Sequence, residues 1–193
     1  MPLFIKSGMD VTKEEIRKQA IERRDQLSAE DRAAYSLAIC ETIMEHEGFL
    51  DARGVHLYLP VRSEVDVKPL INVAWELGKE VGLMRVQPDG GSEQHSILPE
   101  TEYRKGALGI LEPVESEPFD MNICDLVIVP LVAVDEQGNR IGYGKGYYDQ
   151  FLTQFPRPTI GVAFDAQVFS ELPADDMDIQ LDCVVTESRT IYV

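Results

Sequence analysis

The segment of this sequence best suited to chemistry is a glycine-rich run over residues 140–149, which reads R-I-G-Y-G-K-G-Y-Y-D. Three glycines at every second position let the backbone approach a ligand closely and adopt positive φ without a Cβ clash. Peptide N–H groups can then point at phosphate oxygens, and Arg140 and Lys145 add positive charge. A helix beginning near Lys145 would add its N-terminal amides to the same site. The run therefore predicts a polyphosphate cradle.

The spacing of this run differs from that of two well-known phosphate loops. No G-K-[ST] closes it, as in a P-loop, and G-x-G-x-G does not fit the G-x-G-x-x-G dinucleotide fingerprint. A glycine-rich hairpin with a tight turn is the alternative, and the glycines alone do not decide between the two. Tyr147, Tyr148 and Asp149 favour a ligand site, because a carboxylate beside phosphates is where Mg²⁺ finds oxygen ligands.

Two cations near the start of the chain could share that ligand. Lys13 and Arg17 stand four residues apart, so on a helix both lie on one face and repel each other unless an anion binds between them. The alternative is a solvated basic patch softened by Glu14 and Glu15.

The elements that must position these residues alternate between helix and strand. Thr12 and Ser28 have N-cap spacing, and they predict helices to about residue 27 and to about Glu47, the second ended by Gly48. Beyond them we expect strands at 55–59, 81–86, 126–129, 159–163 and 183–186 and a helix over 67–77. We also expect a turn through 135–138 and a short helical turn at 166–169. The segments at 88–93 and 104–113 are expected to be irregular, the second with one short strand at most. This alternation predicts an α/β fold with a central, mostly parallel sheet flanked by helices in three layers. The continuous apolar run at 126–129 indicates a central strand covered on both faces.

Bulk composition predicts one globular domain over residues 1–193, with 44% hydrophobic and 27% charged residues. A formal net charge of −16 argues against nucleic-acid and anionic-membrane partners, so any anion must be held by a local cluster of donors. Without a secretory h-region or a run of about 20 apolar residues, the chain is expected to be cytoplasmic, and we expect a monomer. The three cysteines have no disulfide or zinc spacing and are expected to be buried, and the histidines show no pairing with a Ser or Cys for acyl transfer.

The block over residues 129–149 resembles the signature of the 5-formyltetrahydrofolate cyclo-ligase family, also called 5,10-methenyltetrahydrofolate synthetase. In that family the R-x-G-x-G-x-G-[YF]-Y-D run binds ATP and its aspartate binds Mg²⁺. Residues 13–17 are similar to the K-x-x-[LI]-R pattern on the family's first helix, which belongs to the ATP site. The resemblance implies these ATP-binding residues: Lys13, Arg17, Arg140, Ile141, Gly142, Tyr143, Gly144, Lys145, Gly146, Tyr147 and Tyr148.

Two further segments fit the same family. Residues 58–66 resemble its Y-x-P-x-x-x-E-[VI]-D/E stretch, which implies that Glu64 bonds the donor edge of the pterin and that Leu59 touches the ring, with Tyr148 also on the folate. A charge at the N-terminus of the next helix is the other interpretation of Glu64, and both can hold.

Near the end of the chain, the segment from Leu172-Pro173 onward is similar to the family's L-P…D-x-x-[LV]-D stretch. This similarity makes Asp178 the second Mg²⁺ ligand beside Asp149, with Asp175 and Asp176 close enough to shift the register. Taken alone, this acidic cluster indicates a solvated loop. The chain departs from the family pattern at Gln150, Met177 and Met84.

The activity implied by the resemblance is ATP- and Mg²⁺-dependent cyclisation of 5-formyltetrahydrofolate to 5,10-methenyltetrahydrofolate. The formyl oxygen would attack the γ-phosphate to give an imidate phosphate, N10 would close the ring, and phosphate would leave. The protein would position the reactants and neutralise charge through Arg140, Lys145 and Tyr148. The alternatives are a non-catalytic nucleotide or folate binder and an isomerase-type enzyme acting on sugar phosphates.

Overall fold

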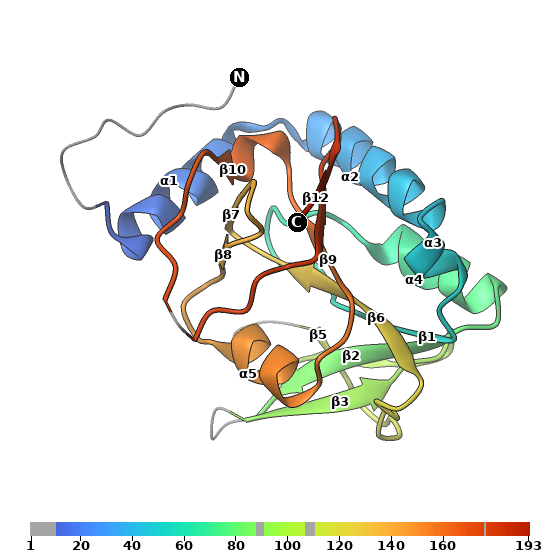
Figure 1. The fold of residues 1–193 in the computed structure, drawn as a ribbon. Helices are drawn as coiled ribbons and strands as arrows, with labels where there is room; N and C mark the ends of the chain where they lie inside the picture. Colours follow the sequence, from blue (N-terminus) through green and yellow to red (C-terminus); the bar gives the residue numbers. More distant parts are fainter. Residues whose placement is uncertain (1–10, 88–90, 107–110, 176) are drawn as a thin grey trace.

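The computed structural model describes residues 11–87, 91–106, 111–175 and 177–193. Within them, the main sheet has seven strands in the order β12-β11-β9-β6-β1-β2-β3 (Figure 1). The strands are β1 (Gly54–Leu57), β2 (Glu80–Val86), β3 (Ser92–Ser96), β6 (Cys124–Pro130), β9 (Thr159–Val162), β11 (Cys183–Val185) and β12 (Thr190–Tyr192). From β2 to β11 neighbouring strands are parallel, whereas the edge strands β3 and β12 are antiparallel. The expected mostly parallel α/β sheet is confirmed.

The parallel strands follow the spatial order β2-β1-β6-β9-β11, so the chain first adds a strand on one side of β1 and then grows on the other. The direction of growth reverses between β1 and β6. In open α/β sheets, ligands bind at the carboxyl ends of the strands at such a switch point. The segment that follows the carboxyl end of β1 begins at Tyr58 and leads to Glu64. The segment that follows the carboxyl end of β6 begins at Leu131 and leads to the glycine-rich run.

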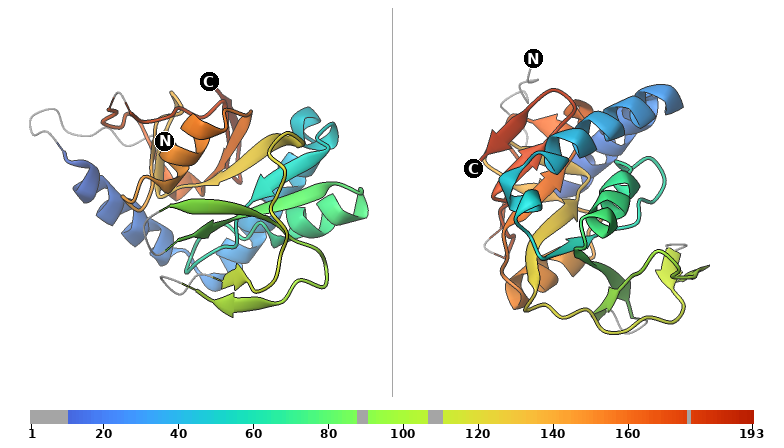
Figure 2. Two further views of the ribbon diagram at one scale, coloured as in Figure 1. Left: turned by 90° about the horizontal axis from the view of Figure 1, so that it is seen from below. Right: turned by 90° about the vertical axis from the view of Figure 1, so that its right-hand side faces the viewer.

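Helices cover both faces of the sheet (Figures 1 and 2). On one side are α2 (Ala29–Met44), α3 (Glu47–Leu50) and α4 (Lys68–Glu76), and on the other is α5 (Tyr147–Gln154). Along β6, Leu126 and Ile128 enter the core under α2 and α4, whereas Val127 and Val129 enter the core under α5. Burial on both faces explains why this strand is continuously apolar in the sequence.

The first helix, α1 (Lys13–Gln26), packs against a smaller sheet of order β10-β7-β8. The strands of this sheet are β7 (Ala133–Asp135), β8 (Arg140–Ile141) and β10 (Val168–Phe169). Ile16 and Ala20 are buried beside Ile141 in the shared core, so the helix lies next to the start of the glycine-rich run. The predicted Thr12 cap is confirmed, since Glu15 N–H donates to Thr12 Oγ1 at 3.3 Å and Thr12 N–H donates to Glu15 Oε2 at 2.9 Å.

Several predicted boundaries are wrong. Helix α2 ends at Met44 rather than near Glu47, and Gly48 lies inside α3, where its N–H donates to His46 Nδ1 at 3.1 Å. The segment expected to be irregular with one strand at most holds two paired strands, β4 (Tyr103–Lys105) and β5 (Leu111–Pro113). Strand β3 begins inside the expected loop at 88–93, of which residues 88–90 lie outside the described residues.

Two expectations drawn from composition can be compared with the structure. Cys40, Cys124 and Cys183 are all buried, as predicted. In the part of the chain that the structure describes, no helix is long and apolar enough to cross a membrane.

Candidate functional site

The glycine-rich run connects strand β8 to helix α5. The expected turn through 135–138 is present, and it precedes the glycines, so the alternative of a hairpin with its turn at the glycines is wrong. Gly144 and Gly146 have φ of +85° and +69°, a region that favours residues without a Cβ. Helix α5 begins at Tyr147, two residues later than expected, and its N-cap Gly146 gives the first amides no side-chain cap. These amides remain available to an anion.

Arg17 contacts this run across 125 residues of sequence. Its Nε donates to the carbonyl oxygen of Gly142 at 2.8 Å. A Cβ built on Gly144 would lie 3.1 Å from Arg17 Nη2, so any larger residue there would push the guanidinium aside. The positive charge of Arg17 therefore lies directly on the predicted phosphate loop.

Lys13 contacts the acidic segment near the end of the chain. Its Nζ lies 2.6 Å from Asp175 Oδ2 and 2.5 Å from Asp178 Oδ2. Burial by itself would raise the pKa of Asp178, but the bonds from Lys13 and from the Asp175 N–H, together with the charge of Arg140, hold that pKa below its usual value. The acidic segment is largely solvated, with the Asp175 side chain 75% exposed, but Lys13 and Asp178 are partly buried partners rather than separate solvated charges.

Arg140 and Asp149 form the second ion pair of the site, with Arg140 Nη2 at 2.7 Å from Asp149 Oδ1. The side chain of Arg140 is buried, and its Nε has no hydrogen-bond partner among the described residues. Ile179 N–H approaches Asp149 Oδ1 at 3.5 Å, and Ile179 follows Asp178 in the chain. The segment that carries Asp178 therefore contacts Asp149.

A metal ion at this point would need ligands besides the protein. Among the residues that the structure describes, no group of three or more His, Cys, Asp or Glu side chains could hold one. Two carboxylates plus phosphate oxygens and waters are nevertheless a usual set for Mg²⁺. Asp176 lies outside the described residues, and the Asp175 side chain is 75% exposed against 22% for Asp178, which favours Asp178 as the second ligand.

Glu64 lies in the loop that leaves the carboxyl end of β1. Its Oε2 accepts the Val61 N–H at 2.8 Å, and burial raises its pKa despite this bond, a hydrogen bond with Tyr143 and the charge of Arg24. Helix α4 begins only at Lys68 and has no acidic residue in its first turn, so the interpretation of Glu64 as a helix-dipole charge is wrong. A buried carboxylate that serves no helix is free to bind a ligand donor.

The other predicted residues differ in what they present to a ligand. Tyr148 is half-buried, and its pKa is raised by burial and by the charge of Glu64, against the influence of Arg140. Leu59 is half-buried against the core under α2 and α4, and Lys145 is exposed. The side chain of Ile141 is buried under α1, which leaves only its backbone for a ligand.

A model of the 5-formyltetrahydrofolate cyclo-ligase family matches residues 9–187. The chain belongs to this family. Two proteins named 5-formyltetrahydrofolate cyclo-ligase are similar to it. The one from Escherichia coli is 31% identical over 87% of this chain and 96% of its own length. The one from Mus musculus is 28% identical over 89% of this chain and 92% of its own length. A solved structure of the 5,10-methenyltetrahydrofolate synthetase of Aquifex aeolicus superposes with a TM-score of 0.83 at 36% identity, covering 93% of this chain and 92% of that one. A solved structure of a 5,10-methenyltetrahydrofolate synthetase from Mycoplasma pneumoniae superposes with a TM-score of 0.74 at 25% sequence identity. It covers 93% of this chain and 99% of that one.

The departures from the family pattern fall at the margin of this site. Gln150 is exposed, and the side chain of Met177 is also exposed, so Met177 adds no polar contact beside Asp178. Met84 packs against the core under α5.

Arg24 is a residue of the site that the sequence analysis missed. It is only 1% exposed, and it reaches Ser63 Oγ and the Tyr143 hydroxyl, each at 3.0 Å. The signal that could have found it is spacing, since seven residues after Arg17 a side chain returns to the same face of a helix.

His95 pairs with a serine, a contact that the sequence did not indicate. Ser116 Oγ lies 2.9 Å from His95 Nδ1, and Glu93 Oε2 lies 3.3 Å from His95 Nε2. The same stretch bonds to β3 through its backbone, with Ser96 N–H donating to the Glu117 carbonyl at 2.8 Å. These contacts fasten the connection before β6 along the edge of the sheet.

Proposed function

We propose that this chain catalyses the ATP- and Mg²⁺-dependent cyclisation of 5-formyltetrahydrofolate to 5,10-methenyltetrahydrofolate, with release of ADP and phosphate. The observation that carries the proposal is the contact of Arg17 with the glycine-rich run, beside two cation–carboxylate pairs, Arg140 with Asp149 and Lys13 with Asp178. The similar proteins carry the name of this activity. We further propose that one cytoplasmic, monomeric domain performs it, with small-molecule substrates as its partners.

The ion pairs of the site support this proposal through their charge pattern. Arg140 with Asp149 and Lys13 with Asp178 each join a cation suited to phosphate with a carboxylate suited to Mg²⁺. In the pairs, each group balances the charge of the other, which limits the cost of partial burial. We propose that Mg²⁺ and ATP bind by partner exchange, so that the carboxylates turn to the metal and the cations turn to the phosphates. When bound, Mg²⁺ would offset phosphate charge.

The residues of the chain then position two reactants rather than form a bond with either. The formyl oxygen attacks the γ-phosphate and ADP leaves. N10 then attacks the carbon of the resulting imidate phosphate and closes the ring, the C–O bond to the phosphate breaks, and inorganic phosphate leaves together with the proton from N10. Arg140, Lys145 and the loop amides hold the phosphates where negative charge develops, which is worth most in a site preorganised for it. Glu64, Leu59 and Tyr148 hold the folate, with Glu64 accepting from the donor edge of the pterin.

A phosphate-release assay with ATP, Mg²⁺ and 5-formyltetrahydrofolate tests the proposal. We expect phosphate release and the absorbance of the methenyl product to appear together, and only when all three are present. Binding of both substrates without turnover would favour a non-catalytic binder. Turnover of a sugar phosphate without ATP would favour an isomerase-type enzyme.

Glu64→Ala is expected to remove most of the thermal protection that 5-formyltetrahydrofolate gives the protein. A ligand at 100 times its Kd stabilises the native state by about 2.7 kcal/mol, and this gain disappears as the Kd rises. The measurement is the shift in Tm on adding the folate. Glu187→Ala is the matched control, because Glu187 also accepts one backbone N–H, from Asp165 at 2.9 Å, outside the proposed site. Equal shifts in both variants would remove Glu64 from the site.

Replacing Lys13 and Arg17 together with Gln is expected to raise the apparent KM for ATP at least about tenfold, and that for the folate much less, because each lost phosphate contact weakens nucleotide binding. The repulsion between two like charges four residues apart would, by itself, let helix stability hold or improve when both are removed. The contacts of Lys13 with Asp178 and of Arg17 with Gly142 instead predict a loss of up to about 1 kcal/mol. The double variant Lys18→Gln/Lys68→Gln, with the same net charge, should keep both KM values. A rise confined to the folate KM would place α1 over the pterin instead.

A further inference from the structure

Arg24 is a fully buried arginine whose hydrogen bonds join two loops. Its Nε donates to Ser63 Oγ in the loop after β1, and its Nη2 donates to the hydroxyl of Tyr143 in the glycine-rich run. Its Nη1 has no hydrogen-bond partner among the described residues. Burying a guanidinium whose donors are not all satisfied is costly. A leucine or methionine would fill the same space without that cost, so packing alone does not explain the arginine.

Tyr143 continues this connection to Glu64. The Tyr143 hydroxyl has one hydrogen to donate and can also accept, so it can donate to the Glu64 carboxylate while it accepts from Arg24. Glu64 is therefore held by the Val61 N–H and lies beside Tyr143 of the glycine-rich run, whose hydroxyl acts to lower the pKa of Glu64 against the larger effect of burial. The conformation of the run sets the position of Tyr143, and Tyr143 in turn orients Glu64.

The loop between these contacts is strained. Arg62 has φ of 55°, a conformation that costs a residue other than glycine about 1–3 kcal/mol and persists only where its surroundings enforce it. Its neighbour Ser63 is fixed from two directions, since its Oγ accepts from Arg24 and donates to Asp25. Arg24 and Asp25 both belong to α1, so the helix that carries Lys13 and Arg17 also holds the loop that carries Glu64.

We propose that Arg24 is a positioning residue that couples the two substrate sites by holding Ser63 and Tyr143 together. A nucleotide that orders the glycine-rich run fixes Tyr143 and thereby Glu64, so the reduced folate then binds a carboxylate already oriented. Coupling between ligands is reciprocal, so the folate strengthens nucleotide binding by the same factor. This inference rests on the proposed function, because it requires both ligands at these loops.

The coupling is measured from the Kd of 5-formyltetrahydrofolate by calorimetry, with and without a non-hydrolysable ATP analogue and Mg²⁺. In the unmodified protein we expect the analogue to tighten folate binding at least about fivefold. Tyr143→Phe and Arg24→Met should each bring this ratio close to one. Combining them should change the ratio no further, because both break the same connection. A role confined to stability would lower Tm and leave the ratio intact.

Tyr143→Phe decides the test if Arg24→Met does not fold, because Tyr143 is 39% exposed and loses only its hydroxyl. Tyr192→Phe, at an exposed tyrosine of strand β12, is the control and should keep the full ratio. If both ligands bind but the ratio is one in the unmodified protein, or survives in Tyr143→Phe, the coupling proposal is overturned and the proposed function stands. If neither ligand binds, the proposed function fails together with the inference.

Discussion

Asp149→Asn is expected to lower kcat by about 100-fold or more, because it removes a negative charge from the proposed Mg²⁺ ligand set. A metal ion contributes several kcal/mol of charge stabilisation in such reactions, and about 3 kcal/mol corresponds to a factor of 100. Asn keeps an acceptor oxygen for Arg140 Nη2, now 2.7 Å from Asp149 Oδ1, so we expect the fold to persist with a modest loss of stability. The measurements are kcat and the Mg²⁺ concentration for half-maximal activity, which should rise.

Asp125→Asn is the matched control for this variant. Asp125 also bonds an arginine, with Arg53 Nη2 at 2.9 Å from its Oδ1, but this pair is exposed at the start of β6. Arg53 holds the pKa of Asp125 down to about 2, so the carboxylate is ionised at neutral pH as a Mg²⁺ ligand would be. Its loss should leave kcat unchanged. Near-normal turnover of Asp149→Asn with an unaltered Mg²⁺ requirement would remove Asp149 from the metal site.

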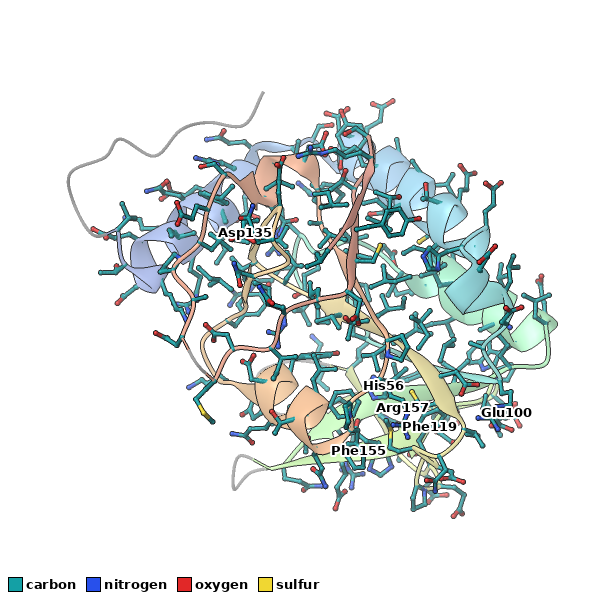
Figure 3. All side chains as sticks on the ribbon, in the orientation of Figure 1. His56, Glu100, Phe119, Asp135, Phe155 and Arg157 are labelled. Atoms are coloured by element: carbon teal, nitrogen blue, oxygen red, sulfur yellow. The ribbon has the colours of Figure 1, made fainter. Side chains whose placement is uncertain are left out.

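Acidification is expected to destabilise this protein through His56. The side chain is fully buried in β1, 4.6 Å between ring centroids from Phe151, and burial lowers its pKa to about 4 despite the hydrogen bond with Gln94. Figure 3 shows it near Phe119, away from Asp135 in the smaller sheet. An unfolded chain takes up this proton near pH 6.5, so between pH 6.5 and 4 the unfolded state binds more protons than the folded state.

Stability falls as the pH falls, because the pKa of His56 is lower in the folded state than in the unfolded state. The contribution of neutral His56 is complete above pH 6.5 and is lost progressively toward pH 4, for a total of roughly 3 kcal/mol. The measurement is the free energy of unfolding in urea at pH 7 and pH 4.5, for the unmodified protein and for His56→Gln, which keeps a polar group for Gln94. His56→Gln is expected to lose less stability over this interval, although it is less stable at pH 7. An equal loss in both proteins would show that His56 does not carry the acid sensitivity.

The expected helices and inner strands followed from local properties of the sequence. A strand buried on both faces must be apolar at successive positions, which made β6 recognisable, and the caps at Thr12 and Ser28 satisfy amide groups within their own first turns. The edge strand β3 was not recognisable, because its residues S-E-Q-H-S are polar and β2 is its only neighbour among the described strands of the main sheet. Strands β4 and β5 are shorter still, with three residues each, and they are defined by their pairing with each other.

The sequence by itself determined which residues make up the proposed phosphate loop, since glycine spacing and adjacent charges are properties of one short segment. Only the tertiary structure decided which charges meet. Helical spacing placed Lys13 and Arg17 on one face, but it could not say that Lys13 would reach Asp175 across 162 residues, or that Arg17 would lie on Gly142. The burial of Arg24 depended likewise on two loops brought together by the sheet. A spacing rule fixes the direction of a side chain relative to its own element, whereas its partners and its exposure to water depend on how distant elements pack.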